Sequence, residues 1–479
     1  MSPYRIDEAY EILAGLEAKV DITELSHKGY LVWPVIRARL WDELLNNHDR
    51  QNSLRQHLRK PTLALRRLVP QIPKSRLERD SAHEAQFVAI SRNAHLQRTP
   101  LGLSPRDRVL GPWIDDVREK SMVYVYGGSR LSRNPEASAP IPKPGWSLGT
   151  SQFRWANLRP ELVRICGTTA KLNQTFALLE DSLWSFRRGL SIGEKILSAS
   201  PNSNSLLNTV WYDTTTQGIT ARCQEFGWEV HDIQHGKQGR NNAMYSQWGF
   251  LSEGTFHSVP TVFHFWGSPS FTLFMETQPN QSSVRGVISG YPWLQFGLEA
   301  SRGERNLVKM PTLLYTLQPP QALNQNRLPG FLSDLIHGDP VGLHVIIRGH
   351  PNDVGGFNQL QEDVESSSFQ NLSFSSPEEN LLDVLSQSTH HITAYSSVVY
   401  EDASMGIPSL VFGEDARVIF RDEIELGQVT WSQGDVGDVL KWIAAPVHTH
   451  ALPNYFANDS TTRINGINAI YKRGSPKIT

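Results

Sequence analysis

Apolar residues recur at helical spacing near the start of the chain. Within residues 5–20 they fall three or four positions apart, at Ile6, Ala9, Tyr10, Leu13 and Leu16, which predicts an amphipathic helix. A second such pattern runs from Trp33 to Leu45, with Pro34 in the first turn, where proline is tolerated. We expect both helices to form an N-terminal extension that packs on the first domain.

From residue 87 onward, short apolar runs alternate with helical patterns. The first series of predicted strands comprises Phe87–Ile90, Met122–Tyr126, Leu206–Tyr212 and Trp228–Gln234, with a helix over Thr216–Phe226. A loop-rich stretch, 290–309, precedes the second series, which comprises Thr312–Thr316, His344–Ile347, His390–Ala394 and Ser409–Phe412. Strands separated by helices indicate parallel sheets with right-handed crossovers. The sequence therefore predicts an α/β chain with an extension and basic linker (1–80) and two domains (81–300 and 301–479).

Composition narrows the classes of function. At 479 residues the chain exceeds one typical core. Its formal charge of −2 gives no overall attraction to nucleic acid. The two cysteines, Cys166 and Cys223, form neither a disulfide framework nor a zinc-binding spacing. We therefore expect a protein of a reducing compartment, with no nucleic-acid partner and no metal.

Two further segments bear on location. The first residues contain no apolar signal-peptide core, and no run approaches the roughly 20 apolar residues that span a bilayer. We expect a cytoplasmic protein. The basic segment from Arg55 to Arg79 has two interpretations: a solvated linker broken by prolines, or a surface that docks on the inner membrane. We favour the linker.

Polar residues follow several of the predicted strands. They are Asp213, then Gln234, His235 and Gly236 in the first half, and His350, Pro351, Ser396 and Ser397 in the second. Parallel sheets bind ligands beyond the carboxyl ends of their strands. Because these positions are divided between both halves, they favour a site in an interdomain cleft.

The segment from Tyr395 to Pro408 carries the most specific chemistry. Ser396 and Ser397 lie in the turn before a predicted helix, and a helix N-terminus favours an anion such as phosphate. Glu401 falls one helical turn after Ser397, on the same face. A phosphate at the turn would leave an attached ribose within reach of this carboxylate, which indicates nucleotide-sugar chemistry.

Three segments resemble a known family. The pattern Ser-x-x-x-Glu-x-Ala-x-x-Gly-x-Pro, from Ser397 to Pro408, resembles the donor-binding segment of two-domain (GT-B) glycosyltransferases. Val345–Pro351 is similar to the strand ending in His-Pro of bacterial sialyl-, Kdo- and polyol-phosphate transferases, and Asp232–Gly236 resembles a strand end of capsule and O-antigen transferases. The resemblance covers roughly residues 205–425. It implies two Rossmann-type parallel-sheet domains that face an interdomain cleft.

The resemblance also implies roles for individual residues. On the donor side it points to His350, Pro351, Ser396, Ser397 and Glu401. Arg348 is either an assisting group or part of a surface ion pair. Gln318 is a further donor-side candidate, because it ends the first predicted strand of the second half. As the group that takes the acceptor proton, Asp232 ranks first and Asp213 second, with His235 as a further candidate. Gln234 and Gly236 fall on the acceptor side. We expect transfer without a metal or a cofactor beyond the nucleotide sugar.

We therefore predict a glycosyltransferase of surface-polysaccharide synthesis that uses a CMP-keto-sugar such as CMP-Kdo and a glycan or lipid-linked acceptor. An alternative enzyme is a nucleotide-sugar epimerase of the same fold, which needs no acceptor. A third hypothesis is a non-catalytic assembly subunit that binds nucleotide without turnover.

Overall fold

The computed structural model describes most of the chain. The described residues are 6–27, 29–45, 85–92, 95–97, 106–115, 121–126, 138–140, 158–238, 242–246, 248, 257–277, 284–301, 310–318, 327–338, 342–351, 353–365, 371–446, 455–457 and 460–471. The basic segment 55–79 lies outside them. Its two interpretations stay predictions.

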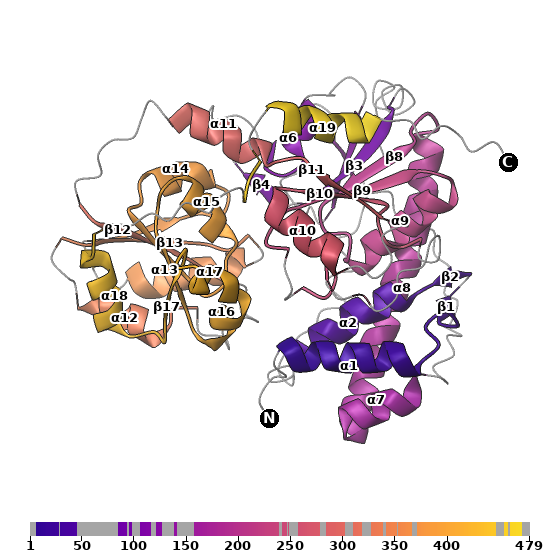
Figure 1. Cartoon of the computed structure of the whole chain (residues 1–479), viewed down its shortest axis with the longest axis horizontal. Helices are drawn as coiled ribbons and strands as arrows, with labels where there is room; N and C mark the ends of the chain where they lie inside the picture. The colour runs from indigo at the N-terminus through magenta and orange to yellow at the C-terminus, as the bar shows by residue number, and fades with distance from the viewer. Residues whose placement is uncertain are drawn as a thin grey trace. The chain divides into compact units, whose positions relative to one another are not determined.

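The chain divides into two compact units (Figure 1). The first unit contains residues 1–92, 109–290 and 457–479, and the second contains 93–108 and 291–456. Both units are therefore built from segments that are discontinuous in sequence. Residues 93–108 supply the second unit with a two-stranded antiparallel ribbon of β4 (Leu96–Gln97) and β5 (Arg106–Asp107). The domain boundaries drawn at residues 80/81 and 300/301 stay predictions.

Seven described strands form a parallel sheet in the first unit. Their order is β11-β10-β9-β8-β3-β6-β7, with bounds Arg285–Ile288, Val262–Phe265, Glu229–Ile233, Ser205–Asn208, Phe87–Arg92, Ser121–Tyr126 and Ser138–Pro140. The predicted strands of this half are present, but β8 ends at Asn208 and not at Tyr212. It ends early because Asp213 donates its backbone N–H to Val210 and turns the chain into α9 (Thr214–Glu225).

Both faces of this sheet are covered by helices. Val88 and Ile90 point to a core shared with α8 (Thr169–Ala199) and α9, whereas Phe87 and Ala89 meet α6 (Gly111–Asp115) and α19 (Ser460–Tyr471). This alternation is the period-two pattern of a strand that is buried on both sides. The unit also contains α7 (Arg159–Cys166) and α10 (Ser268–Glu276).

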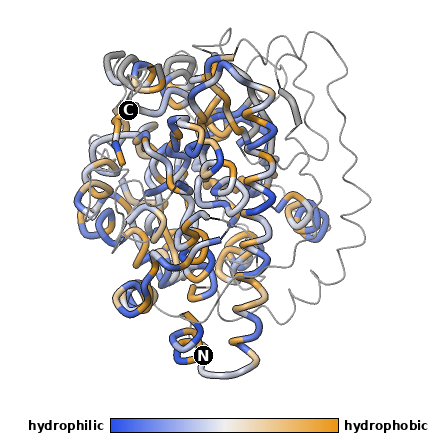
Figure 2. The backbone as a smooth tube through the Cα atoms, turned by 90° about the vertical axis from the view of Figure 1, so that its right-hand side faces the viewer, coloured by the Kyte–Doolittle hydropathy of each residue, from blue (hydrophilic) through white to orange (hydrophobic). Residues whose placement is uncertain are grey.

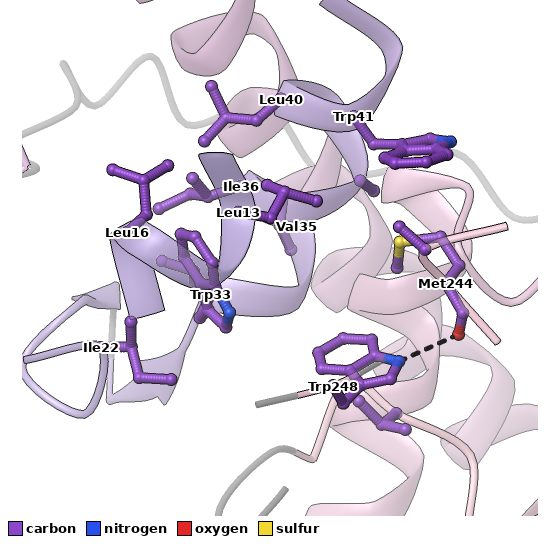
Figure 3. Packing of buried hydrophobic residues seen from close by; sticks show 14 of the residues in the cluster. Leu13, Leu16, Ile22, Trp33, Val35, Ile36, Leu40, Trp41, Met244 and Trp248 are labelled. Atoms are coloured by element: carbon purple, nitrogen blue, oxygen red, sulfur yellow. Dashed lines mark hydrogen bonds between the residues drawn. The ribbon is translucent and has the colours of Figure 1, made fainter. Parts of the chain in front are cut away.

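The two predicted N-terminal helices are α1 (Ile6–Lys19) and α2 (Trp33–Leu45), joined through the ribbon of β1 (Ser26–His27) and β2 (Tyr30–Leu31). Hydrophilic and hydrophobic positions alternate along the helices (Figure 2). The apolar side chains of both helices gather in one cluster, to which Met244 and Trp248 also contribute (Figure 3). The N-terminal helices are therefore part of the core of the first unit.

Two glycines allow α8 and α9 to cross at close range. A Cβ at Gly218 of α9 would lie 2.1 Å from the carbonyl oxygen of Phe186, and a Cβ at Gly189 of α8 would lie 2.1 Å from the carbonyl oxygen of Thr215. Both obstacles are helix backbone, which cannot rotate away. The crossing therefore requires glycine at both positions.

We expect Gly218→Ala to destabilise the protein by about 1–3 kcal/mol or more, since the helices must separate to admit the methyl group. Denaturant unfolding measures this loss. Gly15→Ala in α1 is the matched control, because no atom lies within 4 Å of its added Cβ, and it should be neutral or stabilising by up to about 1 kcal/mol. Equal stability of the Gly218→Ala protein and the control would contradict this account of the crossing.

The second unit contains a second parallel sheet of six described strands. Their order is β14-β13-β12-β15-β16-β17, with bounds Leu372–Ser375, His344–Arg348, Thr312–Thr316, His390–Thr393, Ser409–Phe412 and Thr430–Ser432. The accompanying helices are α11 (Pro292–Ser301), α12 (Gly330–His337), α13 (Val354–Glu365), α14 (Leu381–Ser386), α15 (Val398–Ser404), α16 (Glu414–Ile419), α17 (Arg421–Glu425) and α18 (Val436–Ala444). The two parallel sheets confirm the predicted α/β class. Among the described helices, none has the length and apolarity to cross a membrane.

Candidate functional site

The predicted donor residues follow three strands of the second sheet. Gln318 comes after β12, His350 after β13 and Ser396 after β15. The Gln318 side-chain amide donates to Thr393 Oγ1 at 3.0 Å, and the backbone N–H of Ser396 donates to the same oxygen at 3.4 Å. The structure therefore brings the ends of β12 and β15 together at one edge of the sheet.

Glu401 lies on α15 and is buried, with 1% of its side chain exposed. Burial raises the pKa of Glu401 to about 7, against the opposing charge of Arg108. Arg108 Nη1 donates to Glu401 Oε1 at 3.3 Å. The remaining atoms, Glu401 Oε2 and Arg108 Nε, are buried without a hydrogen-bond partner among the described residues. An enclosed carboxylate oxygen and an enclosed guanidinium N–H thus keep hydrogen-bonding capacity that the described residues do not use.

Arg108 was not among the residues predicted from sequence. It directly follows β5 of the inserted ribbon, and Gln97 of β4 anchors that ribbon by accepting from the backbone N–H of Leu381 at 3.3 Å. The sequence around Arg108 matches no motif, so no local signal would have identified it.

Two more basic groups lie near Arg108. Burial, and then the like charge of Arg108, lower the pKa of Arg348 to about 10, with Glu379 opposing the shift. Burial lowers the pKa of His350 to about 4; Asp353 opposes this shift and Arg108 adds to it. His350 is therefore neutral near pH 7. The two arginines are charged and the neutral His350 offers a hydrogen bond, a combination that suits a phosphate.

Arg348 is held in place within the unit. Its Nη1 donates to Ser375 Oγ at 2.8 Å and its Nη2 donates to the carbonyl oxygen of Glu379 at 2.7 Å. It is 5% exposed. The alternative of a surface ion pair for Arg348 is therefore wrong. Pro351, which follows His350, is exposed.

The serine turn is largely occupied by its own hydrogen bonds. Ser396 Oγ accepts from the backbone N–H of Val398 at 3.3 Å, and the carbonyl oxygen of Ser397 accepts from Tyr400 at 3.0 Å. The Ser397 side chain makes no capping bond to the seven-residue α15. Ser396 therefore caps this turn, and the phosphate-binding role of both serines stays a prediction.

The first sheet carries a second group of predicted residues at its carboxyl edge. Asp232, near the end of β9, is fully buried. Its carboxyl accepts from Tyr245 Oη at 2.8 Å and from the backbone N–H of Trp211 at 3.3 Å. Burial raises the pKa of Asp232 to about 8, although these two hydrogen bonds and the charge of Arg92 oppose the shift. Asp232 is therefore mostly protonated at neutral pH.

His235 lies nearer to solvent than Asp232. It is half-buried, and its Nε2 lies 3.5 Å from Tyr212 Oη. Tyr212 in turn lies close enough to Asp232 for that carboxyl to raise the pKa of the phenol, in addition to the larger effect of burial. Asp232, Tyr212 and His235 thus form one cluster, in which Asp232 is enclosed while Tyr212 and His235 are partly exposed.

Asp213 and Gln234 make structural contacts. Asp213 Oδ1 caps α9 by accepting from the backbone N–H of Thr216 at 3.0 Å, and it lies 3.6 Å from Arg92 Nη2. The Gln234 amide donates to the carbonyl oxygen of Gly236 at 2.9 Å and to Ser270 Oγ at 3.1 Å. Gln234 also accepts from the backbone N–H of Trp266 at 2.7 Å. The catalytic and acceptor roles predicted for these residues stay predictions.

The described residues contain no group of three or more His, Cys, Asp or Glu side chains that could hold a metal ion. The sites at the two sheet edges consist instead of arginine, histidine, tyrosine and single carboxyl groups.

No family model and no curated protein matches the chain. Solved structures do match it. The UDP-GlcNAc 2-epimerase from Neisseria meningitidis, bound to UDP-GlcNAc, matches with a TM-score of 0.51 and 13% identity over 80% of this chain and 99% of that chain. Anabaena HepE in complex with UDP and glucose matches with a TM-score of 0.44 and 8% identity, over 81% and 100%. The wall teichoic acid polymerase TagF matches with a TM-score of 0.41 and 10% identity, over 88% and 92%.

At this level of identity the epimerase match bears on the fold alone. The two parallel sheets described above agree with it. The chain therefore has an α/β fold of the GT-B-like kind, with two Rossmann-like units.

Proposed function

We propose that this chain is an enzyme that uses a nucleotide-activated sugar, and that the second unit binds the nucleotide. The observation that carries the proposal is the Arg108–Glu401 pair near Arg348 and His350, whose Nε and Oε2 atoms are enclosed and have no hydrogen-bond partner among the described residues. Arginine recognises phosphate through charge-assisted hydrogen bonds, and a carboxylate accepts from ribose hydroxyls. This combination matches the two polar parts of a nucleotide.

The leading reaction is glycosyl transfer to a glycan or lipid-linked acceptor, and the resemblance of three motifs to surface-polysaccharide transferases supports it. In this reaction the acceptor oxygen attacks the anomeric carbon of the donor sugar. The bond from that carbon to the phosphate oxygen breaks, and the nucleotide leaves with the electron pair. Arg108 and Arg348 offset the charge that develops on the phosphate.

We assign His235 as the base that takes the acceptor proton. Among the three predicted bases, Asp232 is enclosed and mostly protonated, and Asp213 caps a helix. His235 is half-buried and follows β9, the strand that contains Asp232. A general base typically contributes 10²–10⁴-fold to the rate.

A second candidate function is epimerisation of a nucleotide sugar. The chain is similar in fold to an epimerase that is bound to UDP-GlcNAc. The fold therefore favours epimerisation as much as it favours transfer. Incubation of the protein with CMP-Kdo, CMP-sialic acid and UDP-GlcNAc, with and without oligosaccharide acceptors, separates the two. Transfer adds one sugar mass to the acceptor and releases nucleotide. Epimerisation changes the sugar without an acceptor.

For transfer we expect His235→Asn to lower kcat by about 100-fold or more while the nucleotide Kd changes less than about twofold. Steady-state kinetics and calorimetric titration measure the two quantities. Asp232→Asn is the informative comparison. If it abolishes turnover and His235→Asn does not, Asp232 is the base and the assignment of His235 is wrong.

The donor site has its own test. Arg108→Ala should weaken nucleotide binding by about 10–100-fold, because a hydrogen bond to a charged group contributes about 1.5–3 kcal/mol. The matched control is Arg417→Ala, which removes an arginine of the same unit that is 62% exposed and should leave the Kd unchanged. Equal Kd values for the wild type and the Arg108→Ala protein would contradict the proposed site.

A further inference from the structure

The second unit contains a buried histidine–carboxylate pair that the proposed binding of nucleotide does not use. His391 of β15 contacts Asp402 of α15 through Nδ1 and Oδ2, and both side chains are 0% exposed. The other ring nitrogen of His391 lies 2.9 Å from Thr316 Oγ1 of β12. Ser409 of β16 donates to Asp402 Oδ2 at 3.1 Å. The pair therefore links α15 to three adjacent strands of the sheet.

The His391–Asp402 pair bears on the donor site because Asp402 directly follows Glu401 in the chain. Glu401 and Asp402 are consecutive residues of a helix of seven residues, and both carboxyl groups are buried. Consecutive helical positions lie about 100° apart, so Glu401 meets Arg108 while Asp402 meets His391. Burial of a carboxylate is costly unless it is paired. Each acid on this short helix thus depends on its own basic partner.

We propose that His391 and Asp402 are positioning residues for the donor site: their contact fixes α15 on the sheet and holds Glu401 against Arg108, ready for the nucleotide. The part that concerns the ligand rests on the proposed function. The part that concerns Glu401 and α15 does not, because it is a property of the free protein. Because α15 is short and its Asp402 is bound to the sheet, a rotation of the helix that moves Glu401 away from Arg108 would also break the His391–Asp402 pair.

The pair also acts on Glu401 electrostatically. Besides burial and Arg108, the charges of Asp402 and His391 shift the pKa of Glu401, Asp402 upward and His391 downward. Tyr291 faces the same site: burial raises its pKa, the charge of Arg108 opposes this shift, and the charge of Glu401 adds to it. Removal of the Asp402 charge should therefore lower the pH at which Glu401 ionises.

A double-mutant cycle tests the proposal. The single variants are Asp402→Asn and Glu401→Gln, and melting temperatures of the free proteins are measured first, at pH 5 and pH 8. We expect the two shifts in Tm not to add in the double variant, and to add least well at pH 8, where Glu401, with a pKa of about 7, is mostly charged. Additive shifts at both pH values would overturn the proposal whether or not the protein binds nucleotide.

The nucleotide Kd of the wild type and of the same variants is then measured, with CMP and UDP as probes. Asp402→Asn should weaken binding about tenfold in the wild-type background and less than about twofold in the Glu401→Gln background. A merely structural role would weaken binding equally in both backgrounds, and that result would overturn the proposal. Ser409→Ala is the control, because it removes one hydrogen bond to Asp402 and keeps the pair; it should change Kd less than about twofold.

The outcomes for the two proposals are distinct. If the wild-type protein binds neither probe, the proposed function fails, and the cycle in the free protein decides on the positioning of Glu401. If the wild type binds nucleotide and the cycle is additive, the proposed function stands and the positioning role fails.

Discussion

Replacement of Arg37 by alanine is expected to destabilise the protein by about 3–5 kcal/mol, the loss that follows when one partner of a buried ion pair is removed. Arg37 Nη1 lies 2.8 Å from Glu17 Oε1, and the two side chains are 0% and 5% exposed. In the variant, Glu17 would remain buried without its cation. The free energy of unfolding in denaturant measures the loss.

Arg37 also joins parts of the first unit that are distant in sequence. Its Nε donates to the carbonyl oxygen of Ala243 at 3.2 Å, and its guanidinium lies 4.4 Å from the centre of the Trp248 ring. The side chain thus connects α1 and α2 to the segment that contains Met244 and Trp248, in the cluster of Figure 3. Loss of these contacts adds to the loss of the ion pair.

Two variants separate the contribution of charge from that of packing. Arg39→Ala removes a neighbouring arginine of the same helix that pairs with Glu43 at 3.1 Å, and because these side chains are 18% and 17% exposed, it should cost less than the loss of the fully buried Arg37. Arg37→Met combined with Glu17→Gln removes both charges and should recover part of the stability that Arg37→Ala loses. If the double variant loses as much stability as Arg37→Met and Glu17→Gln lose in sum, the buried charge is not the reason for the loss.

The second large effect concerns Asp232. We expect Asp232→Asn to stabilise the protein, and the gain to grow as the pH rises from about 4 to about 8. Burial raises the pKa of Asp232 from 3.8 to about 8. In that window the folded protein holds a proton that the unfolded chain has released, so the stability of the wild type falls as the pH rises. At 1.36 kcal/mol per pKa unit, the difference at pH 8 is on the order of 5 kcal/mol.

Asparagine preserves the local hydrogen bonds of the protonated acid. Its carbonyl oxygen can accept from the backbone N–H of Trp211, and its amide can donate to Tyr245 Oη, which both lie within hydrogen-bond distance of Asp232. Melting temperatures between pH 4 and pH 8 test this expectation. Asp21→Asn is the control of opposite sign: hydrogen bonds from Thr23 lower the pKa of Asp21, so the stability that this exposed acid contributes is constant above its ordinary pKa of 3.8 and falls only below it. A gain for Asp232→Asn that does not change with pH would contradict the shifted pKa.

Much of the fold was predictable because its signals are local. Runs such as Phe87–Ile90 and Ser409–Phe412 are buried on both faces, so they are apolar throughout and stand out between helical patterns. The Rossmann-like, GT-B-like class followed from this alternation and from the strand-end motifs. The limits of individual strands were less accurate. The chain leaves β8 four residues early because a turn and the Asp213 cap compete with the strand.

The candidate site was predictable only where a motif marks it. His350, Ser396 and Glu401 lie at one edge of the second sheet, as their positions after predicted strands suggested. Glu401 is buried, although an acid in the first turn of a helix is commonly exposed to solvent. Arg108 offsets the cost of burying the carboxylate.

Arg108 marks the limit of prediction from a single sequence. It lies 293 residues before Glu401 in the chain, next to a ribbon that follows β3 of the first unit in sequence but belongs to the second unit. Neither hydrophobic period nor spacing connects two residues over that distance. Asp402 shows the same limit, since its partner His391 lies on a strand whose pattern indicates only burial.

The central claim is that the second unit binds a nucleotide, and thermal unfolding of the wild-type protein with CMP, CDP, UDP, GDP and dTDP tests it most directly. We predict that at least one of them raises Tm and that the rise is smaller in Glu401→Gln, since a ligand at about 100 times its Kd stabilises the native state by about 2.7 kcal/mol. A selective response to CMP would support a CMP-keto-sugar donor, and a selective response to a diphosphate would replace that donor. No rise in Tm with any of the five nucleotides would contradict the account.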